Sequence, residues 1–112
     1  MYGQTIHIRV PAGRMTDLRR IIQDDYLPVL SHRHGFVSAY LMEQCDDEDA
    51  AQLILFWDSH AAAETFARTG SLANSLQALA ATMPGTRLQR QGHIVRVHSG
   101  TPEPVGAAYA RH

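Results

Sequence analysis

The segment that most constrains the fold is AQLILFW, residues 51–57, which carries apolar side chains on both faces of an extended chain. Gln52 is its only polar residue. Such a strand is typical of the centre of a sheet, where both faces are covered. The sequence therefore predicts a central strand whose two faces are each packed against another layer.

The residues before this strand predict a strand, a helix and a second strand. Residues 4–10 alternate between apolar and polar side chains, as a strand with two different faces does. Apolar side chains then recur at helical spacing at Met15, Leu18, Ile22 and Tyr26. We expect Pro28 to kink this helix or restart it one turn later, and Gly35 to end it. Residues 36–44 predict the next strand, and the acidic run 46–49 predicts a solvated hairpin tip.

The residues after the central strand predict a second helical region and a last strand. Asp58 or Ser59 is placed to cap a helix that Gly70-Ser71 interrupts. One face of its second piece is apolar, at Leu72, Leu76, Leu79 and Met83. Residues 86–98 predict the last strand. The order β-α-β-β-α-β indicates a ferredoxin-like α+β fold, in which a four-stranded antiparallel sheet carries both helices on one face.

Length and composition indicate one domain without a nucleic-acid or membrane partner. We place the core in residues 1–98, and we expect the Pro-, Gly- and Ala-rich tail 99–112 to be flexible or to cross onto a partner subunit. The formal net charge is −1 and the ten basic residues are scattered, without the basic stripe that binds nucleic acid. No apolar stretch is long enough to cross a membrane, and Cys45 is alone, so we expect a cytoplasmic protein without a disulfide.

Three short motifs stand at the junctions between these elements: Pro11-Ala12-Gly13, Gly35-Phe36 and Phe56-Trp57-Asp58-Ser59. With the element order, they resemble the antibiotic biosynthesis monooxygenase-like group of the dimeric α+β barrel superfamily, over residues 4–98. The resemblance implies a homodimer in which the sheet faces that carry no helix pair about a two-fold axis. The apolar side chains of residues 51–57 give a physical reason, because an apolar sheet face does not stay in water.

The resemblance also implies a pocket between the sheet and the helices. Some members of the group oxidise anthrones or quinols with O₂ and without a metal or flavin, and others degrade haem. A cofactor-free reaction requires stabilisation of a substrate anion and exclusion of water. The leading hypothesis is a cofactor-independent monooxygenase acting on an aromatic, quinol-like or polyketide-like small molecule. The alternative is a non-catalytic homodimer that binds a small molecule or serves as an interaction module.

Polar side chains of the first and last strands are the candidate catalytic group. Thr5, His7 and Arg9 share one face of the first strand, and His93 lies on the last strand, its neighbour in a ferredoxin-like sheet. His7 is the candidate general base and Arg9 the candidate partner of a substrate oxyanion, with Thr5 and His93 as substrate contacts. The alternative is that His7 and Arg9 are solvated or contact the partner subunit. Metal binding by His7 with His93 is a third hypothesis.

Three aromatic residues complete the candidate substrate-binding set. Trp57 is expected to pack at the junction of sheet and helix, with substrate contact as the alternative. Tyr40 is a candidate hydrogen-bonding group. By alignment from Trp57, Phe66 and Leu76 stand where haem-degrading members carry a Trp and a His, so haem degradation is not expected. Leu72 stands near a position where quinol-oxidising members often carry a His, which favours the non-catalytic alternative.

Overall fold

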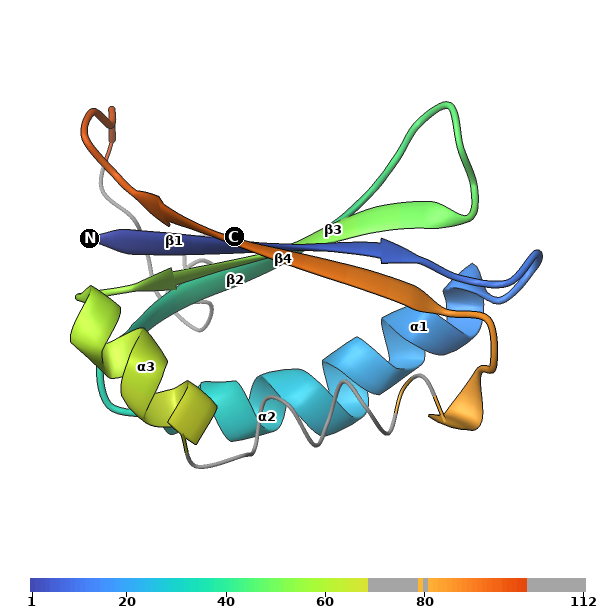
Figure 1. Cartoon of the computed structure of the whole chain (residues 1–112), viewed down its shortest axis with the longest axis horizontal. Helices are drawn as coiled ribbons and strands as arrows, with labels where there is room; N and C mark the ends of the chain where they lie inside the picture. The colour runs from blue at the N-terminus through green and yellow to red at the C-terminus, as the bar shows by residue number, and fades with distance from the viewer. Residues whose placement is uncertain (69–78, 80, 101–112) are drawn as a thin grey trace, which may run out of the picture.

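The computed structural model describes residues 1–68, 79 and 81–100, and it confirms the ferredoxin-like α+β fold. One antiparallel sheet contains β1 (Tyr2–Arg9), β2 (Phe36–Glu43), β3 (Ala50–Trp57) and β4 (Arg87–Ile94). Their order across the sheet is β2-β3-β1-β4, so β1 and β3 are central. The helices lie in a layer on one face of this sheet (Figure 1). We call the other face, which none of the described helices covers, the open face.

The first helix is continuous but changes its hydrogen-bonding pattern. α1 (Met15–Ile21) passes into a π-helical segment (Ile22–Tyr26), which passes into α2 (Leu27–Leu30). The sequence predicted either a kink at Pro28 or a restart one turn later. The restart is wrong, because the helix runs on through Pro28 and the chain widens before the proline. The N–H of Leu27 donates to the carbonyl of Ile22, five residues back. Pro28 donates no such bond and its ring crowds the carbonyl four residues earlier, and a wider turn accommodates this.

Several element ends differ from the predictions. The first helix ends at Leu30, and Gly35, with φ +83°, stands in the turn before β2 instead of capping that helix. Ser59 is the residue that caps α3 (His60–Arg68), since its hydroxyl accepts the N–H of Ala62 at 3.2 Å. β4 is shorter than the predicted strand. The predicted break at Gly70-Ser71, the positions of Leu72 and Leu76, and residues 101–112 lie outside the described residues.

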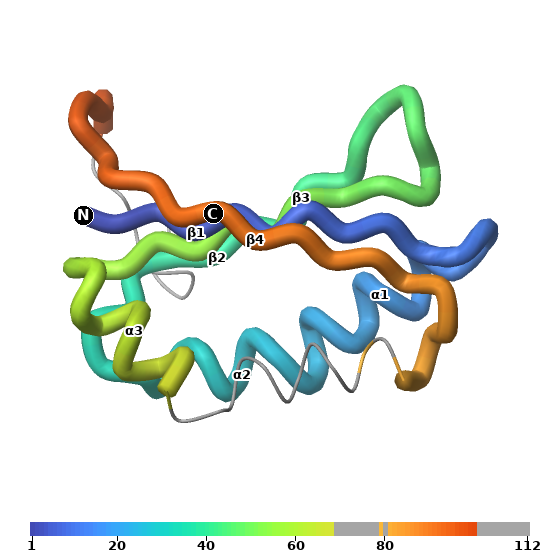
Figure 2. The backbone as a smooth tube through the Cα atoms, viewed as in Figure 1, coloured from blue at the N-terminus to red at the C-terminus, as the bar shows by residue number. Residues whose placement is uncertain are grey.

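Alternation along the strands determines which side chains meet the helices. On β3, Leu53, Leu55 and Trp57 are fully buried on the helix side. Ile54 and Phe56 point to the open face and are only partly buried. Figure 2 shows the acidic β2–β3 loop rising from the sheet on the side away from the helices. The sheet therefore has one buried face and one face with accessible side chains.

No described helix is long and apolar enough to cross a membrane.

Candidate functional site

The seven predicted site residues lie on opposite faces of the sheet. Alternation and strand register place five of them on the open face: Thr5, His7, Arg9, Tyr40 and His93. Trp57 and Phe66 lie instead in the layer between the sheet and the helices. The sequence analysis expected one pocket in that layer. The predicted catalytic pair, His7 and Arg9, is therefore separated by the sheet from Trp57 and Phe66.

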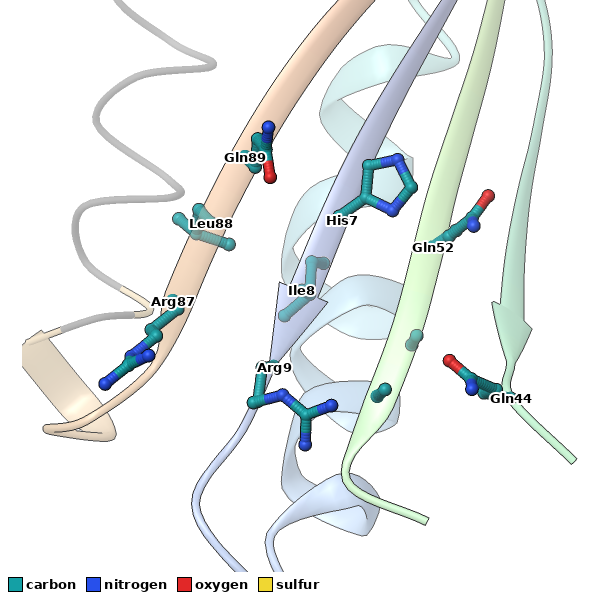
Figure 3. A pocket seen from close by; sticks show the side chains of 10 residues that line it. His7, Ile8, Arg9, Gln44, Gln52, Arg87, Leu88 and Gln89 are labelled. Carbon is teal, nitrogen blue, oxygen red and sulfur yellow. The ribbon is translucent and has the colours of Figure 1, made fainter. Parts of the chain in front are cut away.

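His7 and Arg9 border a hollow of about 370 Å³ at one end of the open face (Figure 3). Its polar side chains are those of His7, Arg9, Gln44, Gln52, Arg87 and Gln89. Arg9 Nη2 donates to Asp47 Oδ2 at 2.6 Å, and this bond holds the pKa of the Asp47 carboxyl below its usual value. The sequence analysis missed Arg87, Gln52 and Gln89, although the alternation of β4 places Arg87 and Gln89 on one face. Recognising them required the register between β1 and β4.

The remaining polar residues of the open face are further along the strands. Thr5 Oγ1 and His93 Nε2 lie 3.1 Å apart, which confirms that β1 and β4 are neighbours. His7 is paired with Gln89. His93 is therefore four residues, or about 13 Å, further along β4, too far for His7 and His93 to share a metal ion. The described residues contain no group of three His, Cys, Asp or Glu side chains that is able to hold a metal.

The open face also carries an apolar patch, which consists of Tyr40, Met42, Ile54 and Phe56 on β2 and β3. Tyr40 is 52% exposed and Met42 is 48% exposed. The ring of Tyr40 meets that of Phe56 edge-on, with centroids 6.4 Å apart. The open face is therefore apolar over β2 and β3 and polar over β1 and β4.

An aromatic cluster fills one end of the layer between sheet and helices. Trp57 is 0% exposed and contacts Phe36 edge-on at 5.6 Å and Phe66 at 5.4 Å between ring centroids. The guanidinium of Arg33 lies over the Phe66 ring, 5.1 Å from its centroid. The expected packing of Trp57 at the junction of sheet and helix is confirmed. The indole Nε1 of Trp57 is buried and has no hydrogen-bond partner among the described residues.

Tyr26 presents a second buried donor to the same layer. It ends the π-helical segment, is 2% exposed and belongs to the core. Its hydroxyl has no hydrogen-bond partner in the part of the chain that the structure describes. Burial raises the pKa of this phenol well above its usual value, and the positive charge of Arg90 opposes the shift only in part. The phenol therefore stays protonated and is a donor at neutral pH. The sequence analysis treated Tyr26 only as part of an apolar stripe, and the nearby Pro28 was the one signal of an irregular helix.

Comparison with known proteins gives structural neighbours only, since neither a protein-family model nor a curated protein matches this chain. A candidate antibiotic biosynthesis monooxygenase from Deinococcus radiodurans superposes with a TM-score of 0.76 at 13% identity, over 90% of this chain and 98% of that chain. A variant of SnoaB, a cofactor-independent oxygenase from Streptomyces nogalater, gives 0.71 at 13% identity, over 87% and 95%. The haem degrader MhuD from Mycobacterium tuberculosis, with two haems in its active site, gives 0.62 at 18% identity, over 88% and 100%.

The three superpositions cover nearly the whole length of each neighbour. The similarity therefore concerns the complete domain and not a shared fragment. At identities of 13% to 18%, this structural similarity establishes the fold alone. The described activities differ even among the three neighbours. The element order of this chain agrees with that fold. The chain has the fold of the antibiotic biosynthesis monooxygenase-like domains of the α+β barrel superfamily.

Proposed function

We propose that this protein is a cofactor-independent monooxygenase that binds an aromatic, quinol-like molecule between its sheet and its helices. The observation that carries the proposal is a pair of buried donors in that layer, Trp57 Nε1–H and Tyr26 O–H, which find no acceptor within residues 1–68, 79 and 81–100. A buried donor without a partner costs about 1–3 kcal/mol. A ligand with phenolic or carbonyl oxygens supplies the missing acceptors, which makes a hydrogen-bonding aromatic molecule the fitting occupant.

The proposed reaction uses the substrate as the only reductant. In an anthrone, loss of a proton, which ends in the water that is formed, gives an enolate whose oxygen accepts a hydrogen bond from Trp57 or Tyr26. O₂ then reacts at the activated methylene carbon, which becomes a carbonyl. One oxygen atom enters the product and the other leaves as water, so the two hydrogens and four electrons all come from the substrate. Fixed donors in a buried layer stabilise the anion more than water does.

His7 and Arg9 do not contact a substrate in this layer, because their side chains are on the other face of the sheet. Their predicted catalytic role requires a substrate on the open face. The proposal therefore assigns stabilisation of the anion to Tyr26 and Trp57, and it leaves the role of His7 and Arg9 as a prediction that the same assay tests.

The test is O₂ consumption with an anthrone and a quinol, using two matched tyrosine variants. Tyr26→Phe removes the buried hydroxyl and should lower the rate at least tenfold. Tyr40→Phe removes an exposed hydroxyl from the open face and should leave the rate within twofold. A rate unchanged in Tyr26→Phe but lost in His7→Ala would place the reaction on the open face and overturn the proposal. Ligand binding without O₂ uptake would support the non-catalytic binding module instead.

We also propose that the protein is a homodimer that pairs through the apolar patch. Tyr40 and Met42 are large, half-exposed apolar side chains beside Ile54 and Phe56, and pairing two copies removes them from water. Light scattering should give about 25 kDa, twice the 12.4 kDa of one chain. Ile54→Glu should give the monomer mass, and Gln91→Glu, on β4, should not. A monomeric wild-type protein at 100 μM would contradict this proposal.

A further inference from the structure

We infer that the hollow around Arg87 and Arg9 binds a small molecule that carries an oxyanion, a carboxylate or a phosphate. This hollow is on the open face, across the sheet from the Tyr26–Trp57 layer, and it lies beside the apolar patch. The inference therefore does not depend on the proposed oxygenase activity.

Strand register brings the two arginines together. Arg9 and Arg87 are direct partners in the antiparallel pairing of β1 with β4, and both side chains point to the open face. Directly opposed residues have their Cβ atoms about 4.5–5.5 Å apart, and like charges at this spacing are unfavourable. Such a pair is stable when an anion lies near both guanidinium groups.

Only one of the two charges is neutralised by the described residues. Arg9 binds the carboxylate of Asp47 at 2.6 Å. The guanidinium of Arg87 has neither an ion pair nor a hydrogen bond within the described part of the chain. Figure 3 shows the two guanidinium groups turned away from each other. The hollow therefore carries one uncompensated positive charge.

The lining of the hollow suits a polar ligand. His7, Gln52 and Gln89 come from three adjacent strands and face the same space (Figure 3). None of the three makes a hydrogen bond to another side chain of the described residues. Together they offer imidazole and amide groups for the hydroxyl or carbonyl groups of a ligand whose anion binds Arg87. A volume of about 370 Å³ is in the range of small-molecule sites.

The proposal is specific to Arg87 because a guanidinium binds an oxyanion through two parallel N–H groups. Arg87→Lys keeps the charge but loses this bidentate geometry. Arg87→Gln loses both. The matched control is Arg20→Gln, which removes the same charge from an exposed position on α1, in the helical layer. A general effect of net charge would affect both Gln variants equally.

The experiment is a ¹H–¹⁵N NMR titration of the full chain with inorganic phosphate and, separately, with malonate at constant ionic strength. We expect saturable shifts at residues 7–9, 52 and 87–89. Arg87→Gln should weaken binding at least fivefold, Arg87→Lys less, and Arg20→Gln less than twofold. Tighter binding of phosphate would assign a phosphate ligand, and tighter binding of malonate a carboxylate ligand.

Shifts that fail to saturate with both anions, or equal affinities in Arg87→Gln and Arg20→Gln, would overturn the inference. O₂ uptake serves as the independent measurement, because Arg87 lies outside the proposed reaction layer. Arg87→Gln should leave O₂ uptake unchanged while it weakens anion binding at least fivefold. The failure of one proposal is thus distinguishable from the failure of the other.

Discussion

The two faces of the four-stranded sheet differ in burial and in polarity. On β1, Ile6 and Ile8 are buried against the helices, while His7 and Arg9, one residue further along in each case, are exposed. On β3, Leu53 is buried and Gln52 is accessible. The helix side is buried and, among the described residues, contains the unsatisfied donors of Tyr26 and Trp57. The open face carries accessible polar and charged groups. Neighbouring residues of one strand therefore differ in role. One side chain packs in the core, and the next is accessible to a ligand on the open face.

The largest expected effect contrasts two adjacent residues of β3. Leu53→Ala removes a fully buried side chain from the central strand and should lower the free energy of unfolding by about 2–5 kcal/mol, from lost burial and the cavity left behind. Gln52→Ala should change it by less than about 0.5 kcal/mol. Urea denaturation measures both. Equal losses in the two variants would mean that the open face is as tightly packed as the helix side.

Two glycines extend the comparison from the strands to the turns. Gly35 has φ +83°, and a Cβ there would lie 2.5 Å from Ala62 Cβ, against α3. Gly35→Ala should therefore cost roughly 3 kcal/mol, through the left-handed backbone and overpacking together. Gly13 has φ +78° with nothing within 4 Å, so Gly13→Ala should cost only about 1–2 kcal/mol. Thermal unfolding of both variants checks the order, and a larger loss in Gly13→Ala would contradict the packing at Gly35.

Local patterns were sufficient to predict the fold and to predict which residues of a strand share a face. The alternation of residues 4–10 put His7 and Arg9 on one face, and the run at residues 51–57 marked the central strand. The same patterns did not indicate which face the helices cover, since both faces of β3 are apolar. The predicted site consequently combined residues from opposite sides of the sheet.

The rest of both sites depends on contacts between distant parts of the chain. Arg87 becomes part of a hollow only because β4 pairs with β1 in a register that sets it opposite Arg9, 78 residues away in sequence. Tyr26 fits a helical stripe equally well whether its hydroxyl is satisfied or not. Its unpaired state depends on the π-helical segment and on the side chains packed against it, which a helical period does not encode.

A pair of tyrosine variants sharpens the contrast between the faces by the sign of the effect. In the absence of ligand, Tyr26→Phe removes a buried hydroxyl without a partner and should raise the free energy of unfolding by about 1 kcal/mol. Tyr40→Phe removes an exposed hydroxyl and should leave it unchanged. Urea denaturation without ligand gives both values. A loss of stability in Tyr26→Phe would indicate that the hydroxyl has an acceptor, which would remove the main support for the proposed ligand site.

The smallest expected effect concerns the ion pair that joins the helical layer to the sheet. Arg19 on α1 donates two hydrogen bonds to Glu43 on β2, at 2.8 and 2.9 Å, and these bonds lower the pKa of Glu43. A carboxyl whose pKa is lower when folded stabilises the fold above its unfolded value, here about 4.5. That contribution is lost as the pH falls through the lower, folded value. Because the pair is largely solvated, the contribution should stay below about 1 kcal/mol.

Arg19→Gln tests this linkage when the free energy of unfolding is measured at two pH values. At pH 7 the variant should be slightly less stable than the wild type, and at pH 3 the difference should shrink as Glu43 becomes protonated in both. The pair of Arg9 and Asp47 beside the open face shifts the pKa of its carboxyl in the same direction. Arg9→Gln should therefore follow the same pH trend. A difference between wild type and Arg19→Gln that is equal at pH 7 and pH 3 would mean that the Arg19 side chain stabilises the protein by packing and not by its charge.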